Sequence, residues 1–138
     1  MPEMDDFNRA IIEEFRANDG KVGGPFEGAP VLLLTATGAK SGQRRTTPVV
    51  YLPDGDRLVI FASKGGAPTN PGWYHNLRAN PSATVEVGTD TVDVDAVVTE
   101  GDERDRLFRK QAALYPQFAD YEKKTTRQIP VIALQPKS

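Results

Sequence analysis

The chain has 138 residues, with 17 Lys plus Arg against 19 Asp plus Glu, a formal net charge of −2, no cysteine and one histidine, His75. This length is typical of one domain, which we expect to span residues 1–138. The composition excludes disulfides, cysteine-ligated zinc, iron–sulfur clusters and a thiolate nucleophile, and a single histidine argues against a multi-histidine metal site or a Ser-His-Asp triad.

Residues 4–18 predict an amphipathic helix, because Met4, Phe7, Ile11 and Phe15 recur every three or four residues as one apolar stripe. We expect this stripe to pack on the core, and contact with a membrane surface is the alternative. No run approaches the ~20 apolar residues that span a bilayer, and the acidic N-terminus does not fit a signal peptide. We therefore expect a soluble cytoplasmic protein, with peripheral contact at the inner face of the cell membrane through residues 4–18 left open.

The next segment predicts three strands in a meander. Residues 30–37 and 46–52 are apolar and β-compatible, and the basic loop GAKSGQRR joins them. The Asp-Gly pair at 54–55 is typical of a tight hairpin turn, so residues 57–62 should return antiparallel to 46–52.

The second half adds helices and three more strands. Residues 73–78 predict a short helix, and 102–114 a charged helix that Tyr115-Pro116 ends before a short aromatic segment. Strands are expected at 83–87, 91–98 and 129–134. About six antiparallel strands with peripheral helices favour a mainly β (α+β) domain built as a closed or nearly closed barrel, and an open α+β sheet is the alternative.

Charge is unevenly distributed along this chain. Residues 28–85 hold two acids and six bases, a balance of +4, while the other residues hold 17 acids and 11 bases, a balance of −6. From charge alone, the basic stretch is either a solvated face or a site for an anionic ligand.

Two segments of the basic stretch carry groups suited to an anion. The loop GAKSGQRR offers Lys40, Ser41, Arg44 and Arg45 beside glycines that allow close backbone approach. The segment SKGG (63–66) precedes a helix N-terminus. Together they would suit one extended acidic ligand, and the alternatives are an exposed hairpin loop and a simple turn. A Walker A loop and a G-x-G-x-x-G motif are both missing, so ATP and Rossmann-type NAD binding lose support.

Aromatic residues also gather in one segment. Tyr115, Phe118 and Tyr121 recur at spacings of three and would share one face of a short helix. They suit an aromatic wall over a flat ring, or ordinary core. Candidates for acid–base catalysis are few, so an enzyme of this composition would take its reactive chemistry from a cofactor.

The ordered set GAKSGQRRTTPVVYLPDGDRLVIFASKGG, NPGWYHNLRANP and LYPQFADYEKKTTRQIPVI resembles the deazaflavin-dependent nitroreductase family, over about residues 20–136. The resemblance implies a split β-barrel, shared with FMN-binding pyridoxamine-phosphate-oxidase-like proteins. It implies coenzyme F420 as cofactor, a deazaflavin with a phosphodiester and an oligoglutamate tail. It also implies hydride transfer from C5 of the reduced deazaflavin to quinones or nitro-type electrophiles.

The same resemblance assigns site residues. Lys40, Ser41 and Arg45 match family positions at the acidic tail, whereas Ala39 replaces a family arginine, for which Arg44 is a candidate substitute. Further expected cofactor neighbours lie on two strands and the following helix: Thr47, Pro48, Val50, Phe61, Ala62, Ser63, Lys64, Trp73 and Asn76.

For the reaction itself, the resemblance makes Ser63 the candidate catalytic residue, hydrogen bonding near the ring and assisting protonation. Tyr115, Phe118 and Tyr121 match the family's substrate wall. Phe118 stands where the nitroimidazole-active member has a tyrosine, which removes a hydroxyl donor. Two alternatives are the same barrel binding FMN and a deazaflavin-binding protein without turnover. A nucleic-acid module built on the basic loop is disfavoured by the negative total charge.

Overall fold

The computed structural model describes residues 2–21, 30–39, 42–62, 72–124 and 129–137. Over these ranges the predicted helices and strands all form, with boundaries shifted by a few residues. In chain order the elements are α1 (Pro2–Ala17), β1 (Val31–Thr37), β2 (Arg44–Asp54), β3 (Arg57–Phe61), α2 (Gly72–Ala79), β4 (Ser82–Val87), β5 (Asp90–Val98), α3 (Gly101–Leu114), α4 (Gln117–Lys124) and β6 (Val131–Pro136).

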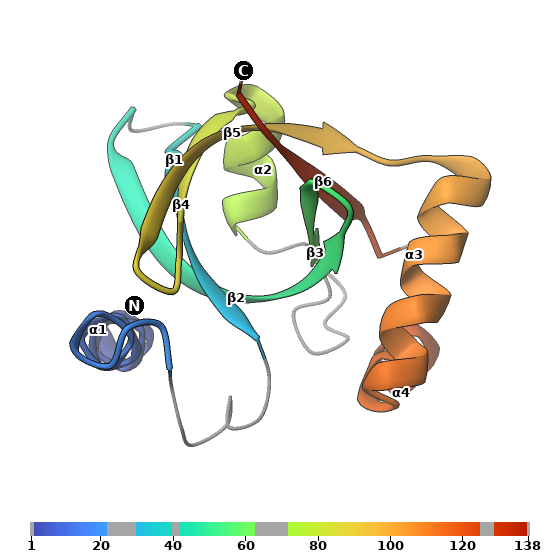
Figure 1. Cartoon of the computed structure of the whole chain (residues 1–138), viewed down its shortest axis with the longest axis horizontal. Coiled ribbons are helices and arrows are strands. Elements are labelled where there is room, and N and C mark those ends of the chain that lie inside the picture. The colour runs from blue at the N-terminus through green and yellow to red at the C-terminus, as the bar shows by residue number, and fades with distance from the viewer. Residues whose placement is uncertain (1, 22–29, 40–41, 63–71, 125–128, 138) are drawn as a thin grey trace.

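The strands close into a barrel in the order β1-β2-β3-β6-β5-β4 (Figure 1). Every neighbouring pair is antiparallel, including the closing pair β1–β4. The closed arrangement confirms the predicted barrel over the open sheet. Closure leaves each strand flanked on both sides, so backbone N–H and C=O groups on both edges find partners.

The barrel interior is filled with aliphatic side chains, and α2 covers one end of it. Leu32, Leu34 and Ile60 are among the buried residues of this interior cluster. Tyr74 and Leu77 of α2 belong to the same cluster, and α2 is seen within the barrel outline in Figure 1. Because neighbouring strands run antiparallel, four strand termini lie near α2: the end of β1, the start of β2, the end of β3 and the start of β6.

The other helices pack outside the barrel. α3 and α4 cover β3 and β6 through a second apolar cluster that contains Phe61, Leu107 and Phe118. α1 lies against β1 and β2, where Phe15 is 1% exposed beside Val31 and Leu33. Ile11 and Phe15 are both buried, which confirms that this half of the predicted stripe packs on the barrel, whereas the side chains of Met4 and Phe7 lie outside the described part of the chain. Over the described residues, no helix is both long and apolar enough to cross a bilayer.

Two of these boundary shifts affect residues considered for the site. β2 begins at Arg44, so the basic loop is shorter than predicted and both of its arginines are strand residues. Tyr115 precedes α4 rather than lying on it. Val98, the last residue of the predicted strand 91–98, is 40% exposed. β5 pairs with β4 only as far as Asp95, so the end of β5 extends past the barrel with β6 on one side.

Candidate functional site

Several predicted cofactor residues lie on the inner side of the barrel near α2. Arg45 pairs with Ala36 and Thr47 pairs with Leu34. Directly paired residues share a face, and Ala36 and Leu34 belong to the interior cluster. The same interior cluster includes Ala62, and Trp73 of α2 packs against it. With Asn76, these residues form what we call the α2-end group: Arg45, Thr47, Ala62, Trp73 and Asn76.

Asn76 connects α2 to the basic loop. Its Oδ1 accepts a hydrogen bond from the backbone N–H of Ala39, at 2.9 Å. The two ends of this loop are joined by a bond from the Gly38 N–H to the Gln43 carbonyl, at 2.8 Å. Gly42 adopts the left-handed φ of 70° that the turn requires. Lys40 and Ser41, which follow Ala39, lie outside the described residues.

Pro48 and Val50 lie on the other face of β2. Val50 packs beneath α1 with Phe15, and Pro48 pairs with Leu33 of the same outer cluster. Their side chains therefore point away from that of Thr47, because successive side chains in a strand alternate. The prediction that all three border one ring stays a prediction.

The predicted substrate residues gather on the outer side of the end of β3. Phe118 is 8% exposed, and its ring lies edge-on to those of Phe61, at 5.8 Å between centroids, and Tyr121, at 5.2 Å. Tyr115 lies 6.4 Å from Phe118, and Phe108 of α3 lies 6.2 Å from Phe61. We call these five residues the aromatic cluster.

The end of β3 connects the two groups. Phe61 points outward into the aromatic cluster, whereas Ala62 lies in the interior cluster beside α2. The Ala62 N–H donates to the Pro130 carbonyl at 3.0 Å, which fixes this junction to the start of β6. Ser63 and Lys64 follow directly and lie outside the described residues. One predicted cofactor residue, Ala62, is thus the chain neighbour of Phe61, which belongs to the aromatic cluster.

Charged groups at the two ends of β2 have different roles. Arg45 is exposed and has no ion pair within the described part of the chain. At the far end, Arg57 pairs with Asp54 and with Glu103, the latter at 3.2 Å. The hydrogen bond from Arg57 lowers the pKa of Asp54 below its ordinary value of 3.8. Arg57 is therefore neutralised and does not contribute to an anion site, contrary to the simple charge count.

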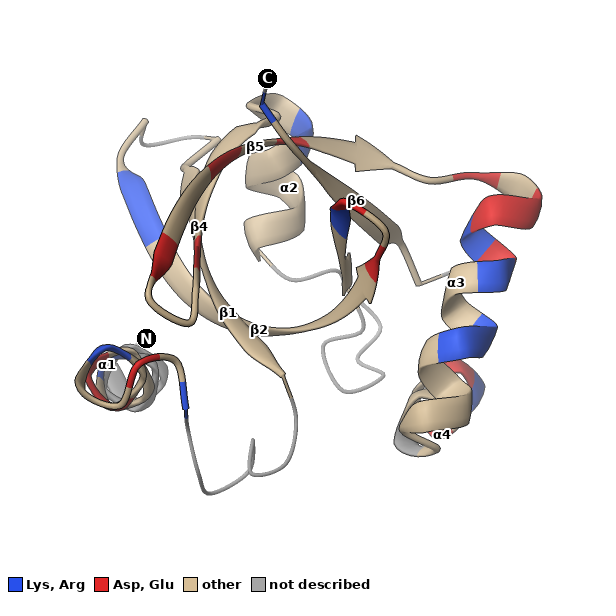
Figure 2. Cartoon of the chain, in the orientation of Figure 1, with Lys and Arg blue, Asp and Glu red and all other residues tan. Residues whose placement is uncertain are grey.

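Arg44 also lies apart from the α2-end group. Its Nη2 donates to Thr84 Oγ1 at 3.0 Å, and Thr84 Oγ1 donates in turn to Asp93 at 3.0 Å. The Arg44 side chain therefore lies on the outer surface of the barrel, where it reaches across β1 to β4. The Arg45 side chain lies on the opposite, inner face of β2. In Figure 2, basic positions mark the start of β2 and acidic positions mark β4 and β5. Arg44 is therefore not suited to replace the family arginine at Ala39.

Sequence reasoning missed two buried polar residues of α3. The Arg104 guanidinium donates twice to the Ile129 carbonyl, from Nε at 3.1 Å and from Nη2 at 2.9 Å, and lies 4.7 Å from the centroid of the Phe108 ring. Gln111 is 0% exposed. Both lie three or four residues from Leu107 or Phe108, and that helical spacing was the signal that could have placed them on the buried face.

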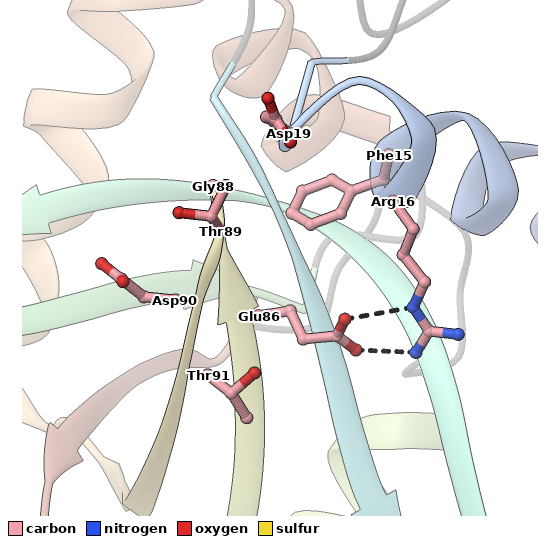
Figure 3. Close-up of a pocket in the computed structure, with 8 residues that line it drawn as sticks. All are labelled: Phe15, Arg16, Asp19, Glu86, Gly88, Thr89, Asp90 and Thr91. Atoms are coloured by element: carbon pink, nitrogen blue, oxygen red, sulfur yellow. Dashed lines mark hydrogen bonds and ion pairs between the residues drawn. The ribbon is translucent and has the colours of Figure 1, made fainter.

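A pocket of about 240 Å³ lies elsewhere, between the end of α1 and the β4–β5 turn (Figure 3). The bidentate ion pair of Arg16 with Glu86 borders it, with N–O distances of 3.1 and 2.7 Å. None of the predicted site residues lines this pocket. Among the described residues, no three metal-ligating side chains cluster together.

Comparisons with known proteins agree with this fold. Residues 7–136 match the family model described as F420H2-dependent quinone reductase. An F420H2-dependent quinone reductase of Mycobacterium tuberculosis is 40% identical over 126 residues, which are 87% of this chain and 83% of that protein. A solved F420-H2 dependent reductase has a TM-score of 0.71 at 39% identity, over 77% of this chain and 94% of that one. A structure described as a domain-swapped dimer has a TM-score of 0.73 at 36% identity, over 94% and 98% of the two chains.

Proposed function

Because the chain belongs to the F420H2-dependent quinone reductase family, we propose that it transfers a hydride from reduced coenzyme F420 to a quinone. Family membership makes the protein an oxidoreductase with coenzyme F420 as its cofactor. The observation that best supports a working site is the junction at the end of β3. There, one residue faces the barrel interior and α2, and its neighbour faces the aromatic cluster.

The α2-end group fits a cofactor with an acidic tail. Arg45 is an exposed cation without an ion pair in the described segments, so its charge is available to a carboxylate or phosphate. The bond between Asn76 and Ala39 ties α2 to the chain immediately before Lys40 and Ser41. We assign the tail to Lys40, Ser41 and Arg45. We assign the ring to Thr47, Pro48, Val50, Phe61, Ala62, Ser63, Lys64, Trp73 and Asn76.

The bound reduced cofactor supplies the hydride in this reaction. The protein's own contribution is to bind, orient and exclude water. The rings of the aromatic cluster lie edge-on to one another, and we assign Tyr115, Phe118 and Tyr121 as the wall for a ring-shaped acceptor. A quinone that takes up a hydride needs one proton, and we assign the Ser63 hydroxyl to hydrogen bond near the ring and assist that protonation.

Nitro-type electrophiles form a second proposed acceptor class. Phe118 has no hydroxyl, and its ring is enclosed by Phe61 and Tyr121. Position 118 therefore offers no hydroxyl donor to the oxygens of a nitro group. We therefore expect quinones to be reduced with higher kcat/KM than bicyclic nitroimidazoles.

Contact of the N-terminal helix with lipid also stays a proposal. Quinones with long tails reside in membranes, but Ile11 and Phe15 are buried against the barrel while α1 is docked. Co-sedimentation with vesicles of anionic lipid, for the whole chain and for a chain lacking residues 1–18, tests it. Equal sedimentation of the two would refute a role for this helix.

The experiment that tests the function compares cofactor binding in variants of the basic positions. Arg45→Ala and Lys40→Ala should each weaken F420 binding, and the loss should shrink as salt is raised because exposed charges are screened. Arg109→Ala, which removes an exposed arginine on the solvent side of α3, is the matched control. Unchanged affinity in both site variants would refute the tail assignment.

Two further measurements separate the alternatives. Titration with FMN and with F420 distinguishes the two cofactors. If the absorbance of the reduced deazaflavin does not change when menadione is added, the protein binds the cofactor without turnover.

A further inference from the structure

Gln111 is the one buried side chain in the described part of the chain whose polar atoms both lack a hydrogen-bond partner. It is 0% exposed, and neither Oε1 nor Nε2 has a partner. A buried carboxamide without a partner loses its hydrogen bonds to water and gains nothing in return. Such groups are rare in folded proteins and call for a physical explanation.

The neighbouring arginine shows that this buried face can satisfy polar groups. Arg104 lies two helical turns before Gln111 on the same side of α3, and its guanidinium bonds to the Ile129 carbonyl and to Asp105. Both residues share one face of α3, yet only Arg104 has partners. The lack of partners is therefore specific to the Gln111 position.

The position of Gln111 relates it to the predicted acceptor site. Phe108, one turn before it, contacts Phe61 at the end of β3. Tyr115, one turn after it, contacts Phe118, and its backbone N–H donates to the Gln111 carbonyl at 2.8 Å. The carboxamide thus belongs to a stretch of α3 whose preceding and following turns both reach the aromatic cluster.

We propose that the Gln111 carboxamide binds the oxygen of the acceptor that is reduced. This inference rests on the proposed function and deepens it, because it names a further polar group that recognises the quinone oxygen beside the aromatic cluster. The Nε2–H donates to a quinone carbonyl oxygen, and the Oε1 accepts from a hydroxyl. In the reaction the quinone gains a hydride from the reduced cofactor and one proton, and its two carbonyls become the two hydroxyls of the hydroquinone. One carboxamide therefore serves both substrate and product.

Access to Gln111 requires a movement of the aromatic cluster. In the structure the carboxamide is enclosed, and α4, only eight residues long, carries Phe118 and Tyr121. Arg104 of α3 bonds to the Ile129 carbonyl and pairs with Glu122 of α4 at 3.7 Å, while Phe118 of α4 packs against Phe61 of the barrel. The proposal therefore requires that entry of the acceptor ring displaces the packed side chains of α4 and uncovers the carboxamide.

The test replaces Gln111 by methionine, which keeps an unbranched side chain of similar length without the amide. Gln111→Met should raise the KM for menadione about twofold to tenfold, the usual worth of one hydrogen bond, and leave the Kd for F420 unchanged. Its melting temperature should equal or exceed that of the wild type, because an unpartnered amide is removed. Gln135→Met, the same change at an exposed position of β6, is the control. It should leave the KM for menadione, the Kd for F420 and the melting temperature unchanged.

Each other outcome overturns the proposal. An unchanged KM for menadione means that the amide does not contact the acceptor. A weaker Kd for F420 assigns the amide to the cofactor instead. A lower melting temperature, or failure to fold, means that the amide is structural. If the wild-type chain binds F420 but does not reduce menadione, the proposed function fails first, and this inference falls with it.

Discussion

Replacement of Arg104 by methionine tests how a buried charge holds α3 to the barrel. The Arg104 side chain is 8% exposed and donates to the Ile129 carbonyl from two nitrogens, at 3.1 and 2.9 Å. Hydrogen bonds from a charged donor contribute about 1.5–3 kcal/mol, and the contact with the Phe108 ring adds about 0.5–1 kcal/mol. Methionine keeps the apolar stem and removes the cost of burying the guanidinium, which offsets part of this loss.

We therefore expect Arg104→Met to lower the free energy of unfolding by about 2 kcal/mol and the melting temperature by about 6–8 °C. Urea unfolding at neutral pH and calorimetry measure these values. Arg109→Met, at an exposed position of the same helix, should stay within about 0.5 kcal/mol of the wild type. If Arg104→Met is as stable as the wild type, or more stable, the desolvation cost exceeds the bonds to Ile129 and the reasoning is wrong.

Three further predictions concern stability and specificity. Asp54→Asn should destabilise the protein at pH 7, and the effect should shrink as the pH falls below 3.8, because the Arg57 hydrogen bond lowers the folded pKa of Asp54 and its stabilisation is lost as the pH falls through that folded pKa; a difference independent of pH in urea unfolding would contradict this. Gly20→Ala should destabilise by about 2 kcal/mol or more, since the added Cβ would lie 2.6 Å from a backbone atom of the β4–β5 turn at a φ of +96°. Gly42→Ala, with φ of +70° and open space, should cost only the backbone strain, and equal losses in the two would refute the steric argument. Phe118→Tyr should shift kcat/KM toward nitro compounds and leave F420 affinity unchanged; a large loss of cofactor binding would contradict its place in the substrate wall.

The barrel was predictable because its signals are local. Alternating side chains such as those of Val85 and Val94 predicted the β4–β5 hairpin, and the Asp54-Gly55 pair predicted the turn between β2 and β3. The true start of β2 was not predictable in the same way. Arg44 and Arg45 are polar and look like loop residues, and only pairing with β1 makes them strand residues.

Features of the site that depend on distant residues could not be predicted. The neutralisation of Arg57 requires Glu103, which belongs to α3 on another part of the chain. The separation of Arg44 from Arg45 follows from the alternation of β2, which needs the correct register. Gln111 is polar, and polar helical residues usually face solvent, so its burial emerges only once α3 is placed on the barrel. The side-chain types were readable from the sequence, and the faces on which they lie were not.

The position of β6 has a consequence for how this chain folds. β6 is the final strand in the sequence, yet it lies between β3 and β5 and pairs with both. During synthesis, β3 and β5 therefore each keep one unpaired edge until residues 131–136 emerge from the ribosome. Contacts so distant in sequence form slowly, because a long loop must close first. A chain that ends before Val131 would expose two unpaired strand edges at once, and we expect it to aggregate rather than fold.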